Sequence, residues 1–203
     1  MPENDNPKGP NTVTTTSSSP TLDAERTDLL ALLATARSAL INTTRGLGDE
    51  QAKATPTVSA LCLGGLVKHV AAMEAQWLRF VVEGPGAMNY ELPEGVTWAD
   101  IAAGAAREIP QWMIDHQNGF RLLPGETLAG VVEHYEQVAA RSAEVIAALP
   151  DLSVTHPMPD APWHEPGTVW SVRRVLLHVI AETTQHTGHA EILRESIDGQ
   201  KSS

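Results

Sequence analysis

Apolar side chains recur at helical intervals in four long stretches of the chain. The spacing predicts helices over about residues 22–45, 59–84, 126–149 and 171–197. The second stretch carries one clear apolar stripe, made of Leu63, Leu66, Val70, Met73, Trp77 and Val81. Helix-ending residues follow the first three stretches, and Ser171 is a suitable N-cap for the fourth.

The connections between these stretches are irregular. Residues 98–117 predict one or two shorter helices, interrupted by Pro110. Residues 150–170 contain five prolines and two histidines, which predicts an irregular crossing. Because no segment shows the alternation of a convincing strand, the chain is expected to be all-α. We predict a four-helix bundle with a long, partly helical connection between its second and third helices.

Composition favours one domain with one core. The chain has 203 residues, of which 42% are hydrophobic. Residues 1–20 contain almost no side chain that could anchor to a core, so a disordered N-terminal tail is predicted there. The helical domain is expected over residues 21–199, and residues 200–203 are expected to be a disordered end.

Charge and cysteine content limit the partners and the compartment. A formal net charge of −11 argues against nucleic acid and anionic membranes as partners. Cys62 is the only cysteine, which excludes an internal disulfide and favours a small core residue over a nucleophile. No stretch is long and apolar enough for a membrane span, and no signal peptide is evident. The expected location is the cytoplasm.

Four potential metal ligands lie on one side of the last predicted helix. His178, Glu182, His186 and His189 occur within twelve residues and fall within an arc of roughly 80° on a helix that turns about 100° per residue. This arc borders the apolar stripe of the helix, where unpaired polar groups are costly. A bound metal ion would satisfy them.

A metal site needs a ligand from a second helix. Glu182 and His186 stand four residues apart, so that both can reach one ion, but a catalytic divalent site usually has three protein ligands. His69, beside the apolar stripe of the second helix, is the best third candidate. The alternative is a core-edge histidine that is bonded to a backbone carbonyl or to Glu74.

The remaining histidines are predicted to be surface residues. His134 lies further from the apolar stripe of its helix, and the other three fall in weakly patterned or loop segments. These three are His116, His156 and His164.

The stretches LGGLVKHVAAMEAQW and SVRRVLLHVIAETTQHTGHAEILRESIDG resemble DinB-like proteins, and in particular the actinobacterial branch related to mycothiol-dependent enzymes. The resemblance covers roughly residues 22–199. It implies a four-helix bundle that holds zinc or nickel through one histidine of the second helix and two ligands of the last helix. The implied triad here is His69, Glu182 and His186. The glutamate replaces the histidine found in many members, as in mycothiol-dependent maleylpyruvate isomerase.

The same resemblance implies thiol chemistry. An open position on a divalent ion can hold a small thiol, such as mycothiol, as a nucleophilic thiolate. The expected activity is thiol S-transfer or thiol-dependent isomerisation, with His178 and His189 beside the ligands. A metal-dependent hydrolase and a non-catalytic metal-binding or stress-response bundle remain alternatives. A homodimer is expected from the resemblance alone.

Overall fold

The computed structural model describes residues 23–88 and 90–201. The N-terminal tail predicted for residues 1–20 lies outside this part, as do the last two residues of the predicted C-terminal end.

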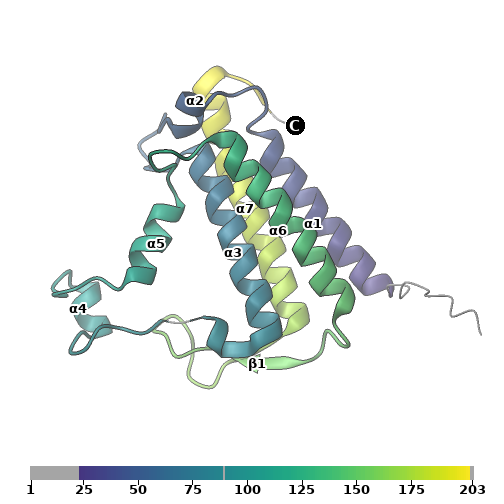
Figure 1. Cartoon of the computed structure of the whole chain (residues 1–203), viewed down its shortest axis with the longest axis vertical. Helices are drawn as coiled ribbons and strands as arrows, with labels where there is room; N and C mark the ends of the chain where they lie inside the picture. The colour runs from purple at the N-terminus through teal and green to yellow at the C-terminus, as the bar shows by residue number, and fades with distance from the viewer. Residues whose placement is uncertain (1–22, 89, 202–203) are drawn as a thin grey trace, which may run out of the picture.

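Four long helices lie side by side along the molecule (Figure 1). They are α1 (Ala24–Asn42), α3 (Leu63–Glu83), α6 (Leu128–Ala148) and α7 (Val172–Asp198). Each corresponds to one of the four apolar stretches, with ends within about four residues of the predicted ones. The described chain is therefore mostly helical, as the apolar spacing predicts.

Shorter elements fill the connections. These are α2 (Asp49–Lys53), a 3₁₀ helix η1 (Gly84–Ala87), α4 (Trp98–Ala102), α5 (Gln111–Gly119), β1 (Thr155–Pro157) and β2 (Val169–Ser171). The two helices α4 and α5 confirm the partly helical connection. The expectation of no strand was wrong, because β1 and β2 pair antiparallel with His156 opposite Trp170. Three residues are too few for an alternating pattern to be visible in the sequence.

Local signals in the sequence explain the ends of the long helices. The side chains of Asp23, Thr127 and Ser171 cap α1, α6 and α7 by accepting hydrogen bonds from backbone N–H groups of the first turn. Gly84 ends α3 and Gly199 ends α7, with φ angles of 74° and 73° respectively. Positive φ angles of this size favour glycine. The predicted cap at Ser171 is thus confirmed.

The centre of the molecule is apolar but contains one buried charge pair. Glu74 is fully buried, and it accepts hydrogen bonds from the guanidinium of Arg37 and from the hydroxyl of Ser142. These three residues come from α3, α1 and α6, so the pair ties three helices together. Glu74 does not bond His69, which removes one of the two partners considered for that histidine.

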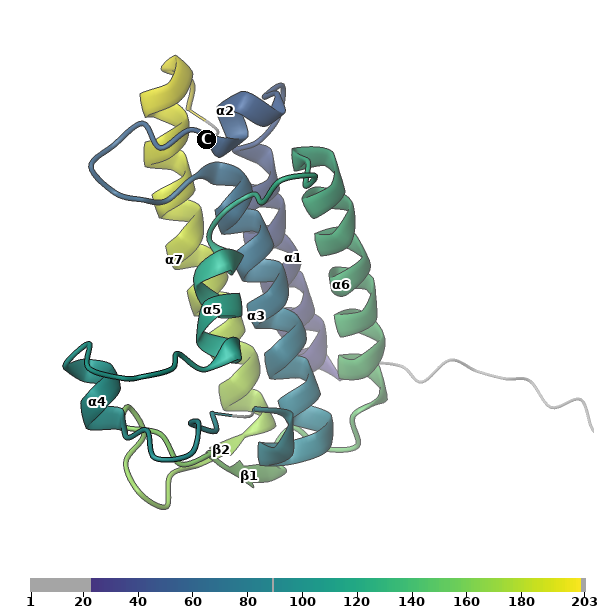
Figure 2. The same cartoon turned by 60° about the vertical axis from the view of Figure 1, so that its left-hand side comes forward.

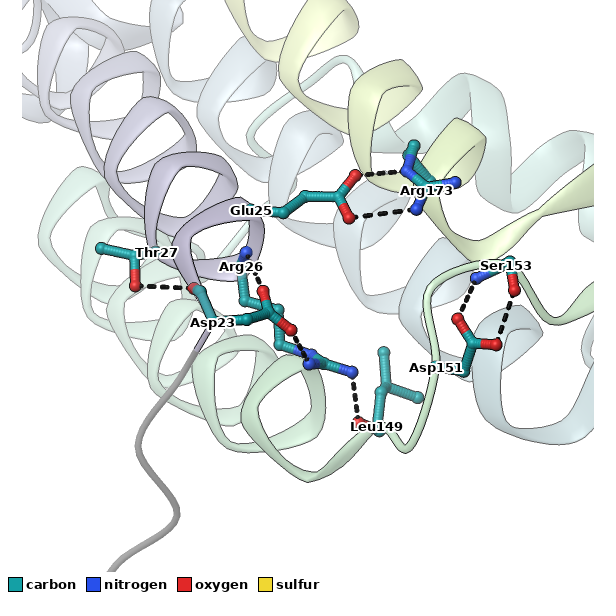
Figure 3. A network of polar contacts seen from close by, with 8 residues as sticks. All are labelled: Asp23, Glu25, Arg26, Thr27, Leu149, Asp151, Ser153 and Arg173. Carbon is teal, nitrogen blue, oxygen red and sulfur yellow. Dashed lines mark hydrogen bonds and ion pairs between the residues drawn. The ribbon is translucent and has the colours of Figure 1, made fainter.

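Polar contacts join the first helix to the end of α6 and to the start of the last helix (Figure 3). Nη2 of Arg26 donates to the carbonyl of Leu149 at 2.7 Å, and Glu25 pairs with Arg173 at the start of α7.

None of the described helices is both long and apolar enough to span a bilayer.

Candidate functional site

The site lies between α3 and α7, which pack against each other. His69 of α3 and His186 of α7 meet edge to face, with ring centroids 4.9 Å apart. His69 retains only 8% of its surface exposed, and His186 is half-buried. The helix spacing places both rings at the border of the core, as the position of each beside an apolar stripe predicts.

Helix α5 covers one side of this site. Helix α5 contacts α3, and Figure 2 shows it in front of that helix. Phe120, directly after α5, stacks on the ring of His69 with a centroid distance of 3.8 Å and an interplanar angle of 22°. His116 of α5 approaches His69 at 5.4 Å. The connection between α3 and α6 thus contributes two rings to the site.

Two glycines of α3 let this connection approach closely. A Cβ atom at Gly65 would lie 2.0 Å from the carbonyl oxygen of Phe120, and one at Gly64 would lie 2.4 Å from Cδ1 of Leu122. A side chain at Gly65 is therefore incompatible with the observed path of the backbone at residues 120–121, whereas one at Gly64 would displace the end of the Leu122 side chain. The Gly64–Gly65 pair positions Phe120 over His69.

The polar residues of α7 continue from His186 in both directions. Oε2 of Glu182 lies 3.8 Å from Nε2 of His186, one turn earlier in the helix. Nδ1 of His189 lies 3.4 Å from Nδ1 of His186, so one ring donates to the other. Glu182, His186 and His189 therefore form one row on α7, and His186 is the member of this row whose ring contacts His69.

Burial favours the neutral form of two histidines of the site, His69 and His186. Burial lowers the pKa of His69 to about 3, with further lowering by His186 and His116. Burial also lowers the pKa of His186, although the carboxylate of Glu182 opposes this shift. Neutral imidazoles present a lone pair, which suits metal binding or proton transfer.

His178 lies apart from this group. Its ring packs edge to face on Trp77 at 4.7 Å and on Trp170 at 5.2 Å, closer to the start of α7. Burial lowers the pKa of His178 as well, and the carboxylate of Glu182 opposes this. His178 therefore extends the row by one turn toward the start of α7, where its ring contacts Trp77 and Trp170.

The predicted triad is brought together in part. His69 and Glu182 each lie near His186, but no three His, Cys, Asp or Glu side chains of the described residues are grouped as a metal-binding set. The donor types nevertheless fit a divalent ion, since two neutral imidazoles and one carboxylate are a common ligand set. The assignment of His69, Glu182 and His186 to a metal stays a prediction.

Three of the four predicted surface histidines make defined contacts. His116 is exposed, yet its ring touches His69. His156 and His164 are part-buried, and they bond the carbonyls of Val81 and Pro159. The signal for His116 was its spacing of four residues from Phe120, the C-cap of α5, which brings both rings to the same side, but the weak periodicity of that segment concealed it.

These features define the class of the protein. It is a mostly helical protein in which two histidines, the buried His69 and the half-buried His186, meet between the long helices α3 and α7. The chain belongs to the mycothiol-S-transferase family, which it matches over residues 28–199. The match confirms the resemblance to the DinB-like actinobacterial branch and indicates a small thiol, mycothiol, as a substrate. Comparison with curated proteins and with solved structures gives no match.

Proposed function

We propose that the protein is a metal-dependent thiol S-transferase, built on a four-helix bundle of the DinB type, that uses mycothiol. The observation that carries the proposal is the meeting of His69 and His186 across α3 and α7, with Glu182 beside His186, in a member of this family. His69, Glu182 and His186 would hold the ion. A divalent ion bound there stabilises the thiolate form of a thiol at neutral pH, which makes the sulfur nucleophilic.

The surrounding residues prepare the ligands. His189 is a positioning residue, because its Nδ1 can accept the Nδ1–H of His186 and leave Nε2 of His186 free to bind. Phe120 covers one face of His69, which excludes water from that side and limits the ring to one orientation. The low pKa of His69 keeps this imidazole in the neutral form that a ligand requires.

The reaction joins the thiol sulfur to an electrophilic carbon. The sulfur attacks that carbon, the carbon–sulfur bond forms, and the bond to the leaving group breaks. The leaving group departs with the electron pair, and the thiol proton passes to solvent.

The first experiment follows conjugation of mycothiol to monochlorobimane by fluorescence, with chloride as the leaving group. Metal content is measured on the same samples by elemental analysis. We expect about one divalent ion per chain and a rate well above that without protein. His69→Asn and His186→Asn should lower both metal content and rate.

His134→Asn is the matched control, because His134 is exposed on α6. It should change neither readout. Unchanged metal content in both site variants would refute the ligand assignment. A rate equal to the uncatalysed one, across several electrophiles, would favour a metal-binding protein without catalysis. Ester or amide turnover without added thiol would favour the hydrolase instead.

A further inference from the structure

A groove with a volume of about 390 Å³ lies at the start of α7. Its walls are Trp170, Ser171, Arg173, Arg174, Leu177 and His178; we call it the α7 groove. His178 is one helical turn from Glu182, and Arg174 is about 12 Å from Glu182 along the helix axis. The α7 groove therefore ends next to the proposed thiol site.

Arg174 is held in place without using its hydrogen-bond donors. Its guanidinium lies over the ring of Trp170, 4.5 Å from the centroid, and Trp170 in turn stacks on Trp77 at 5.1 Å with nearly parallel planes. A stacked guanidinium uses its face for the contact and keeps its in-plane N–H groups free, which suits bidentate binding of a carboxylate.

Arg174 is also the cation of the α7 groove without an acidic partner. The neighbouring Arg173 is paired with Glu25 (Figure 3). Among the described residues, no carboxylate forms an ion pair with Arg174, and its side chain donates no hydrogen bond to them. The first turn of α7 adds the positive end of a helix dipole nearby.

The rest of the α7 groove offers apolar contact. Leu177 is 49% exposed, so its side chain is available for contact, and burial lowers the pKa of His178, which favours an uncharged ring. The chain as a whole carries a net charge of −11. At physiological salt, however, the interaction between exposed charges is largely screened beyond about 8 Å. Local charge therefore decides which ligand the α7 groove accepts.

We propose that the α7 groove binds the second substrate, and that this substrate is a small electrophile carrying a carboxylate. Arg174 binds the carboxylate, and Leu177 and His178 contact the apolar body. The electrophilic carbon then points along α7 toward the sulfur near Glu182 and His186. This assignment rests on the proposed function, because it names the second substrate of the same site.

The test compares two electrophiles that differ only in charge. Mycothiol is incubated with 4-(bromomethyl)benzoate or with 4-(bromomethyl)benzamide, and each rate is divided by the rate without protein. In both reactions the sulfur replaces bromide at the benzylic carbon, and the thiol proton passes to the buffer. We expect Arg174→Gln to lower kcat/KM for the benzoate about tenfold and to change that for the benzamide less than twofold.

Arg141→Gln is the matched control, because Arg141 is an exposed arginine on α6 outside the α7 groove. It should affect neither substrate. Binding of the unreactive 4-methylbenzoate, measured by isothermal titration calorimetry, gives a readout that needs no turnover. The affinity should fall about tenfold in Arg174→Gln and stay unchanged in Arg141→Gln.

The outcomes separate the two proposals. If wild-type protein conjugates both probes and Arg174→Gln treats them alike, the carboxylate site is wrong and the transferase stands. If neither these two probes nor monochlorobimane reacts while 4-methylbenzoate binds in an Arg174-dependent way, the transferase is wrong and the anion site of the α7 groove stands. If none of the three electrophiles reacts and 4-methylbenzoate does not bind, both are overturned. If monochlorobimane alone reacts and 4-methylbenzoate does not bind, the carboxylate site is wrong and the transferase stands.

Discussion

The close approach of residues 120–122 to α3 predicts that Gly65→Ala destabilises the protein. The added Cβ would lie 2.0 Å from the carbonyl oxygen of Phe120, whereas real Cβ contacts are essentially never under 3.0 Å. The oxygen must therefore retreat by at least 1 Å, and it belongs to backbone that cannot rotate away. Overpacking of this kind costs about 1–3 kcal/mol.

The preference of alanine for helices works in the opposite direction. Replacing glycine inside a helix by alanine gains up to about 1 kcal/mol. For Gly65→Ala we expect a net loss of about 1–2 kcal/mol in the free energy of unfolding. For Gly64→Ala the loss should be smaller, because the clash is with the end of the Leu122 side chain. Gly188→Ala is the matched control, since nothing lies within 4 Å of its Cβ position in α7, and it should gain stability.

Urea unfolding of the three variants, with equal m-values, measures these differences. NMR of the His69 ring protons provides a local readout, because Phe120 stacks on this ring and moves with the displaced backbone. Gly65→Ala should shift the His69 signals, and Gly188→Ala should not. A Gly65→Ala protein that is as stable as Gly188→Ala would refute the close approach and the role of the glycine pair in positioning Phe120.

Three further predictions concern stability. The pKa of His69 is lowered by burial to about 3 from an ordinary value of 6.5, so the unfolded chain takes up a proton that the metal-free folded protein does not. Unfolding free energy should therefore fall as the pH drops below 6.5, by about 2 kcal/mol at pH 5, and His69→Asn should flatten this pH dependence in urea titrations. Glu74→Gln should lower the free energy of unfolding by about 3–5 kcal/mol, because it leaves Arg37 buried without its charge partner. If the double variant Arg37→Met with Glu74→Met lost as much stability as the single variants Arg37→Met and Glu74→Met lose together, this pairing would be contradicted. Ser171→Ala should lower the melting temperature through a loss of about 1 kcal/mol at the N-cap of α7, and Ser171→Asp should restore most of it.

The long helices were predictable because each buries a continuous face. Residues at helical spacing, such as Leu66 and Val70, are fully buried, and the predicted cap at Ser171 forms. The two strands were not predictable in this way. They are three residues long, and their pairing depends on contacts made at a distance, such as the ring of Trp170 on Trp77.

Part of the candidate site was predictable for the same reason. His69 and His186 lie beside the apolar stripes of their helices, so packing of α3 on α7 brings their rings within 4.9 Å. The contribution of α5 was not predictable, because that helix is short and weakly amphipathic and its position depends on the small size of Gly65. The unpaired state of Arg174 could also not be read from the sequence, since its neighbour Arg173 has the same chemistry and is neutralised by Glu25.

The polar row of α7 therefore has two parts with different neighbours. From Glu182 to His189 the row lies beside His69, where burial lowers the pKa values of His69 and His186 and the proposed ligands can gather around an ion that binds the thiol. From Arg174 to His178 the row contacts Trp77 and Trp170, and the guanidinium of Arg174, which lies over the Trp170 ring, has no acidic partner among the described residues. A nucleophile needs the first environment and an anionic electrophile needs the second. Both environments occur on one helix, with Arg174 about 12 Å from Glu182 and about 18 Å from His186 along the axis, so the proposed binding of the two substrates needs no change in the arrangement of the long helices.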